Sequence, residues 1–154
     1  MPVSGTLRAV KKTAYTSPQD AEAAFYEALQ AGNLDAMMEV WAEDEELVCV
    51  HPGGPRLVGF DQVRASWAQM MGSGQRLQVR ISDPVYMQSM MLSVHSLHEI
   101  IAVPGQARPQ PVATINVYLR TGTGWRMVAH HASPVPQVAQ RPVETVEASP
   151  KILH

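Results

Sequence analysis

Apolar residues recur at three- and four-residue intervals in the first part of the chain. Ser17-Pro18-Gln19-Asp20 combines a side-chain cap, a proline for the first helical position and an early acid, which is typical of a helix start. Beyond it, apolar positions with helical spacing are Ala21, Ala24, Phe25, Ala28 and Leu29. Gly32 tolerates the left-handed backbone that ends many helices. The pattern therefore predicts a helix from about residue 18 to residue 31.

Two more helices and a short strand are predicted before residue 72. Asn33 can cap a short second helix, and residues 46–52, ELVCVHP, have the composition of a strand that runs into a turn. Strand alternation places Leu47, Cys49 and His51 on one face. The apolar stripe of a third helix follows Gly59 and consists of Phe60, Val63, Trp67 and Met70.

From about residue 76 onward, the apolar pattern has a period of two. Residues 76–81, 90–103, 111–120 and 124–133 alternate as strands do, and the last two are joined by a Thr-Gly-Thr-Gly turn. Helices followed by consecutive antiparallel strands indicate an α+β fold with helices on one face of a sheet. In residues 111–120, Ile115 and Leu119 share one face, and Thr114 and Asn116 share the other. Apolar side chains on both faces of a sheet must both be buried. We therefore expect helices on one face and a second subunit of a homodimer on the other.

The last strand, GWRMVAHHAS, carries two adjacent histidines. Strict alternation puts His131 on the face of Trp125, Met127 and Ser133, and His130 on the opposite face. We therefore expect His131 to face the interior. Adjacent strand residues cannot hold one ion together, and no carboxylate or cysteine pattern supports a metal site, so neither a metal nor a cofactor is expected.

Composition limits the class of protein. A chain of 154 residues that is 45% hydrophobic is long enough for one core. We expect a folded domain over residues 17–133, with an N-terminal tail of residues 1–16 and a proline-containing C-terminal tail of residues 134–154. The formal net charge of −2 provides no basic face for nucleic acid. No apolar run approaches the roughly 18 residues that cross a bilayer, and the single Cys49 suits a reducing compartment, so a cytoplasmic location without membrane contact is expected.

Three stretches carry a resemblance to a known family. The helix corner AGNLDAM, the stretch HPGGPRLVGFDQVRASW and the terminal GWRMVAHHAS resemble the SnoaL-like branch of the nuclear transport factor 2-like (cystatin-like, ketosteroid isomerase-like) superfamily. The resemblance covers about residues 18–133. It implies a cone-shaped α+β fold, in which three N-terminal helices pack on a curved antiparallel sheet around a conical apolar pocket. The pocket residues that it implies are His51, Trp67, His131, Ser133, Phe25 and Trp41.

Several of these residues also have a plainer interpretation. His51 precedes Pro52 at the end of a strand, where it can support the turn, contact a ligand or act as a base. Core packing is the default role of Trp41 and Trp67, and stacking on a flat ligand is the alternative. Ketosteroid isomerases of this superfamily place their acidic base before a proline, a position that matches His51. Their tyrosine donor falls on Phe25, and Tyr26 is turned by about 100° along the helix, so the catalytic residues stay unassigned.

Three functions remain open from the sequence. The first is a protein that binds a small hydrophobic molecule in an apolar cone, with His51, His131 and Ser133 as polar anchors. The second is a cofactor-free enzyme, such as an isomerase, dehydratase or cyclase, that uses a pocket histidine as general base. The third is a dimeric association module. We rank them in this order.

Overall fold

The computed structural model describes residues 11, 13–74, 76–106 and 108–136. The helices in this part of the chain are α1 (Pro18–Ala31), α2 (Leu34–Val40) and α3 (Phe60–Met71). The strands are β1 (Val48–Val50), β2 (Arg56–Val58), β3 (Gln78–Gln88), β4 (Leu92–Ala102), β5 (Gln110–Thr121) and β6 (Gly124–Pro134). All six strands form one sheet in the order β2-β1-β6-β5-β4-β3.

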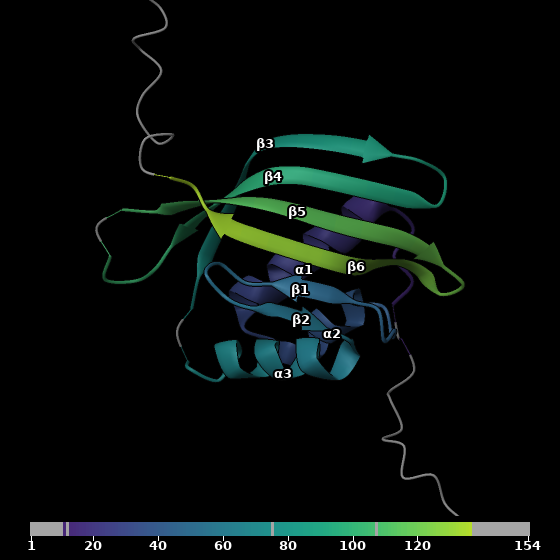
Figure 1. The fold of residues 1–154 in the computed structure, drawn as a ribbon, viewed down its shortest axis with the longest axis horizontal. Helices are drawn as coiled ribbons and strands as arrows, with labels where there is room; N and C mark the ends of the chain where they lie inside the picture. Colours follow the sequence, from purple (N-terminus) through teal and green to yellow (C-terminus); the bar gives the residue numbers. More distant parts are fainter. Residues whose placement is uncertain (1–10, 12, 75, 107, 137–154) are drawn as a thin grey trace, which may run out of the picture.

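The expected α+β layering is present, with two differences of detail. In Figure 1, α1 passes behind the sheet and α3 lies below its β2 edge. Only α1 and α2 are N-terminal, because β1 and β2 precede α3, so the expectation of three N-terminal helices is wrong in that respect. The sheet is antiparallel except where β1 runs parallel to β6. The short β1–β2 hairpin thus lies at the β6 end of the sheet.

The signals that predicted α1 act as expected. The Ser17 hydroxyl accepts the Asp20 backbone N–H at 3.0 Å, and Pro18 occupies the first turn. At the other end, Gly32 has a φ of 64° and donates its N–H to the carbonyls of Ala28 and Leu29. These caps fix the two ends of α1, and its buried side faces the sheet.

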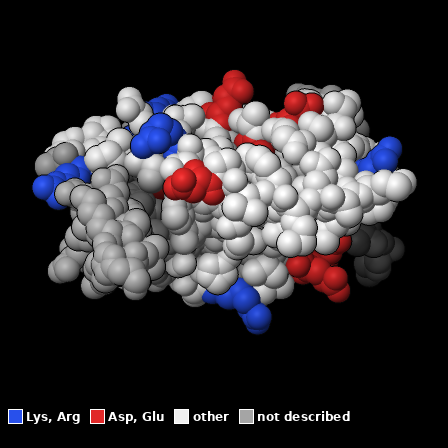
Figure 2. Space-filling view, turned by 90° about the horizontal axis from the view of Figure 1, so that it is seen from above, with Lys and Arg blue, Asp and Glu red and all other residues white. Residues whose placement is uncertain are grey.

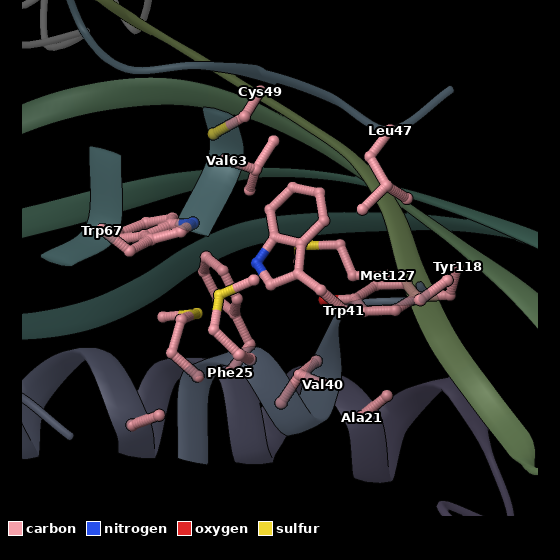
Figure 3. Packing of buried hydrophobic residues seen from close by; sticks show 14 of the residues in the cluster. Ala21, Phe25, Val40, Trp41, Leu47, Cys49, Val63, Trp67, Tyr118 and Met127 are labelled. Carbon is pink, nitrogen blue, oxygen red and sulfur yellow. The ribbon is translucent and has the colours of Figure 1, made fainter. Parts of the chain in front are cut away.

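Large rings fill the space between α1 and the sheet. Phe25 and Trp41 are 0% exposed, and Trp67 is 1% exposed. Figure 3 shows these rings packed above α1 with Tyr118 and Met127. The packing gives Phe25, Trp41 and Trp67 a structural role in the core.

A β-bulge in β6 reverses the predicted orientation of the paired histidines. Val117 pairs with Ala129, but the next residue, Tyr118, pairs with Met127, so Val128 is an extra residue in β6. Beyond the bulge the inward positions change from odd to even numbers. His130 is therefore 3% exposed inside the fold, and His131 is exposed on the outer face. The prediction that His131 faces the interior is wrong, and the same shift puts Ser133 outside.

The two predicted tails lie mostly outside the described residues. Within the first, Tyr15 accepts the Trp125 backbone N–H at 2.9 Å, and Thr13 accepts a hydrogen bond from the Arg126 guanidinium. The boundaries of the domain at residues 17 and 133 stay a prediction. No helix of the described residues is long and apolar enough to span a membrane.

Candidate functional site

A pocket of about 530 Å³ opens where the end of α1, the β1–β2 turn and α3 meet. Most of the side chains around it are apolar, and none of them is an acid or a base other than histidine. The lining residues are Leu29, Gly32, His51, Pro55, Leu57, Ser66, Gln69, Met70, Met71, Ser73 and Leu77. This volume lies within the range of small-molecule sites.

His51 is held in one orientation in this pocket. Its Nε2 lies 3.0 Å from the Ser66 hydroxyl, which in turn donates to the Val63 carbonyl at 2.7 Å. Because the hydroxyl proton is used there, Ser66 accepts from His51, and we assign the ring proton to Nε2. The Trp67 ring meets the imidazole edge to face, with centroids 4.6 Å apart. Nδ1 of His51 therefore carries a lone pair.

Burial sets the protonation state of this site. It lowers the pKa of His51 below its usual 6.5, because removal of water disfavours the imidazolium. The ring is thus neutral at neutral pH, and Nδ1 serves as a hydrogen-bond acceptor and a weak base. The neighbouring Cys49 thiol lies 3.7 Å from Nε2, but burial raises its pKa to about 12. Cys49 therefore stays protonated and is not a nucleophile.

Of the six residues implied by the resemblance, only His51 lines this pocket. Phe25, Trp41 and Trp67 are core residues. His131 and Ser133 instead line a hollow of about 190 Å³ on the outer face, near His98 and Asp83. The structure thus brings together His51 and the α3 residue Ser66, which the sequence did not single out. A serine one position before a core tryptophan, with no chemical motif around it, gives no signal in the sequence.

A chain of four buried polar side chains crosses the interior. Tyr26 donates its hydroxyl to Glu99 at 2.6 Å, and Asn116 donates its amide to the Tyr26 oxygen at 2.8 Å. The other end of Asn116, Oδ1, accepts from His130 Nδ1 at 2.6 Å. All three bonds run in the same direction, from His130 toward the carboxyl group of Glu99. We call Glu99, Tyr26, Asn116 and His130 the central chain.

Burial shifts both ends of the central chain toward their neutral forms. It raises the pKa of Glu99 to about 6 and lowers the pKa of His130 to about 3. The pKa of Tyr26 is raised above its ordinary value by burial and by Glu99. Tyr26 is turned by about 100° from Phe25 along the helix, but both residues are buried, because the inward side of α1 is wide enough to include them.

A second buried group joins α1 to the start of β4. His95 Nδ1 donates to Glu22 Oε2, and His95 Nε2 lies 2.8 Å from the Ser93 hydroxyl. The order acid, histidine, serine is that of hydrolytic triads. However, Ser93 and His95 are both 0% exposed, so a substrate cannot reach the hydroxyl. We interpret Glu22, His95 and Ser93 as a structural group that fixes α1 on the sheet.

No group of three or more His, Cys, Asp or Glu side chains in the described part of the chain is arranged to hold a metal ion. His95 and His98 lie on opposite faces of β4, as their spacing predicts. His95 is buried, whereas the side chain of His98 is 43% exposed and lies 3.5 Å from Asp83.

Comparisons with known proteins agree on the fold. Residues 19–137 match the family described as SnoaL-like domain. A candidate calcium/calmodulin-dependent protein kinase type II association domain from Thiobacillus denitrificans is 36% identical, with a TM-score of 0.72 over 81% of this chain and 100% of that one. A candidate dehydratase of the NTF2-like family from Streptomyces avermitilis is 32% identical, with a TM-score of 0.70 over 75% of this chain and 91% of that one.

A more distant structure has the same architecture. A candidate ketosteroid isomerase from Parabacteroides distasonis is 17% identical, with a TM-score of 0.63 over 79% of this chain and 89% of that one. At this identity the likeness concerns the fold alone. No protein with a curated description matches the chain.

Proposed function

This chain belongs to the SnoaL-like domain family, within the NTF2-like superfamily, and from this premise we propose that it binds a small, largely apolar molecule in the pocket beside His51. Its relatives include structures described as a dehydratase, an isomerase and an association domain. The family therefore does not select one activity, and the support for this function comes from the pocket.

The orientation of His51 is the observation that carries this proposal. A neutral imidazole whose Nε2 is engaged by Ser66 offers Nδ1 as its one acceptor, in a pocket with mostly apolar walls. Sites for small molecules typically combine apolar walls with a few fixed polar groups of this kind. The lowered pKa of His51 also makes Nδ1 a weaker base, and for this reason we rank proton abstraction by His51 below binding.

A neutral fluorescent probe, N-phenyl-1-naphthylamine, tests for binding. Leu57 lines the pocket, whereas Val58 is its neighbour in β2 and is exposed. We expect the wild type to enhance the fluorescence of the probe saturably. Leu57→Trp fills the pocket and should weaken binding at least about tenfold, which corresponds to about 1.4 kcal/mol.

Val58→Trp is the matched control, because it adds the same ring on the opposite face of the same strand. Its affinity for the probe should equal that of the wild type. Absence of saturable binding to the wild type, or an equal loss in both variants, contradicts the proposed pocket.

We also propose that the outer face of the sheet pairs two copies of the chain. Val85 and Met87 of β3 are 65% and 75% exposed, and Ile115 and Leu119 of β5 are 41% and 37% exposed. The pairing registers place these four side chains on the face away from α1. Contiguous apolar surface of this kind is typical of an interface. Figure 2 looks onto the β3 edge and shows wide uncharged areas between scattered charged groups.

Substitution of Ile115 tests this second proposal. Ile115→Lys places a charge at the centre of the outer face, where desolvation of an ammonium group opposes pairing. We expect the wild type to have twice the mass of one chain by light scattering, and Ile115→Lys to have the mass of one chain. Val58→Lys should remain dimeric. A monomeric wild type would exclude the homodimer.

A further inference from the structure

The guanidinium of Arg76 lies against Gly32, at the rim of the His51 pocket. A Cβ built on Gly32 would be only 1.8 Å from Arg76 Nη1, so the guanidinium occupies the place where a side chain would begin. Gly32 itself lines the pocket, and so does Leu77, which follows Arg76. The end of α1 and the segment before β3, which are far apart in the sequence, thus place the Arg76 guanidinium beside the apolar walls of the pocket.

Two independent features favour glycine at position 32. Its φ of 64° is in the left-handed region, where residues with a Cβ are rarely found. In addition, the lack of a side chain leaves room for the guanidinium.

Arg76 has no acidic partner in the described part of the chain. No ion pair or hydrogen bond of its side chain is present there, and none of the pocket-lining residues is acidic. The end of α1 has a weak attraction for a cation, and α1 has no basic residue in its last turn. The Ala28 and Leu29 carbonyls already accept the N–H groups of Gly32 and Asn33. Among the described residues, the guanidinium donors thus have no hydrogen-bond partner, and they can bind an anionic group of a ligand.

We propose that the pocket takes an amphipathic anion, with an apolar body between Leu29, Leu57 and Met70 and a carboxylate or similar anionic group on Arg76. This inference rests on the proposed binding function and narrows its ligand class. A planar guanidinium is well suited to a carboxylate or sulfonate, because two parallel N–H donors match two oxygen atoms. His51 then lies on the apolar side of the pocket as the acceptor for a donor on the ligand body.

Two probes with the same ring system separate the contribution of the charge from that of the apolar body. The first is 8-anilinonaphthalene-1-sulfonate, an anion, and the second is N-phenyl-1-naphthylamine, which lacks the sulfonate. We expect Arg76→Gln to weaken binding of the anion about tenfold and to leave binding of the neutral probe unchanged, as expected for loss of a charge-assisted hydrogen bond. The anion should also be the more salt-sensitive of the two in the wild type.

Arg120→Gln is the matched control, because Arg120 is an exposed arginine of β5 and neither it nor its chain neighbours line the pocket. It should bind both probes as the wild type does. If the wild type binds the neutral probe but Arg76→Gln and Arg120→Gln bind the anion equally, the anion site is overturned and the binding function stands. If the wild type binds neither probe, both proposals fail. Equal weakening of the two probes in Arg76→Gln would assign Arg76 a structural role and would also overturn the anion site.

Discussion

Glu22→Ala is expected to destabilise the fold by about 3–5 kcal/mol, the usual cost of removing one member of a buried polar pair. The Glu22 carboxylate is the acceptor for His95 Nδ1 and also receives the Tyr86 hydroxyl at 3.3 Å. Glu22 is 5% exposed and His95 is 0% exposed, so water cannot replace the lost acceptor without opening the contact between α1 and β4. Chemical denaturation at pH 7 measures the loss.

Glu27→Ala provides the control for this result. Glu27 lies on the same helix and is exposed, so its removal tests the change in helix propensity without the buried contact. We expect no measurable loss of stability from it. A loss below about 1 kcal/mol in Glu22→Ala, within the range of ordinary substitutions, would mean that His95 does not depend on Glu22.

The sequence predicts the fold well because apolar periodicity sets most of its elements. The Ser17 cap and Gly32 mark both ends of α1, and Gly59 with its apolar stripe marks α3. The α+β class follows from the order of these elements. The sequence order also predicts that α3 follows the strand at residues 46–52, but β2 was not predicted. The expectation taken from the family resemblance grouped α3 with the N-terminal helices.

The orientation of side chains in β6 could not be predicted in the same way. Alternation holds only while strands pair one residue to one, and the bulge at Val128 breaks this rule. Nothing in the letters GWRMVAHHAS marks the extra residue. The bulge decides which of His130 and His131 reaches the interior, so the site prediction failed at His131 and Ser133 although the strand itself was correct.

The central chain was hidden from the sequence for a different reason. Glu99, Tyr26 and Asn116 come from three elements, and each is polar, so periodicity alone favours an exposed position for them. They can be buried because each forms a hydrogen bond with another of them. The phenol of Tyr26 donates to Glu99 and accepts from Asn116. Pairing of this kind depends on strand register and helix placement, which the sequence pattern does not give. His51 could be identified because its place, at the end of a strand and before a proline, can be recognised from the local sequence alone.

Acid is expected to destabilise this protein through His130, by about 3 kcal/mol between pH 7 and pH 4. The pKa of His130 is about 3 in the folded protein, against 6.5 without burial. Between these values the unfolded chain binds a proton that the folded one does not. The stability contributed by neutral His130 is therefore complete above pH 6.5 and declines as the pH falls toward 3.

Glu99, at the other end of the central chain, acts in the opposite direction. Its pKa is raised from 4.5 to about 6, so between these values the folded state binds the additional proton. Glu99 therefore adds stability as the pH falls from 7, by about 2 kcal/mol at pH 4. The acid response of the wild type is therefore the loss of stability through His130 minus the gain through Glu99. Glu99→Gln removes the offset, because glutamine does not titrate and its amide oxygen can still accept from Tyr26.

Urea unfolding at several pH values between 7 and 4 separates the two groups. We expect a steeper loss of stability toward acid in Glu99→Gln than in the wild type, and a shallower loss in His130→Asn, whose amide can replace the bond to Asn116. Gln110→Asn is the control, since Gln110 is exposed and carries no titratable group, and its pH profile should follow that of the wild type. If His130→Asn loses stability toward acid as steeply as the wild type does, the imidazole of His130 is not the group whose burial makes this fold sensitive to acid.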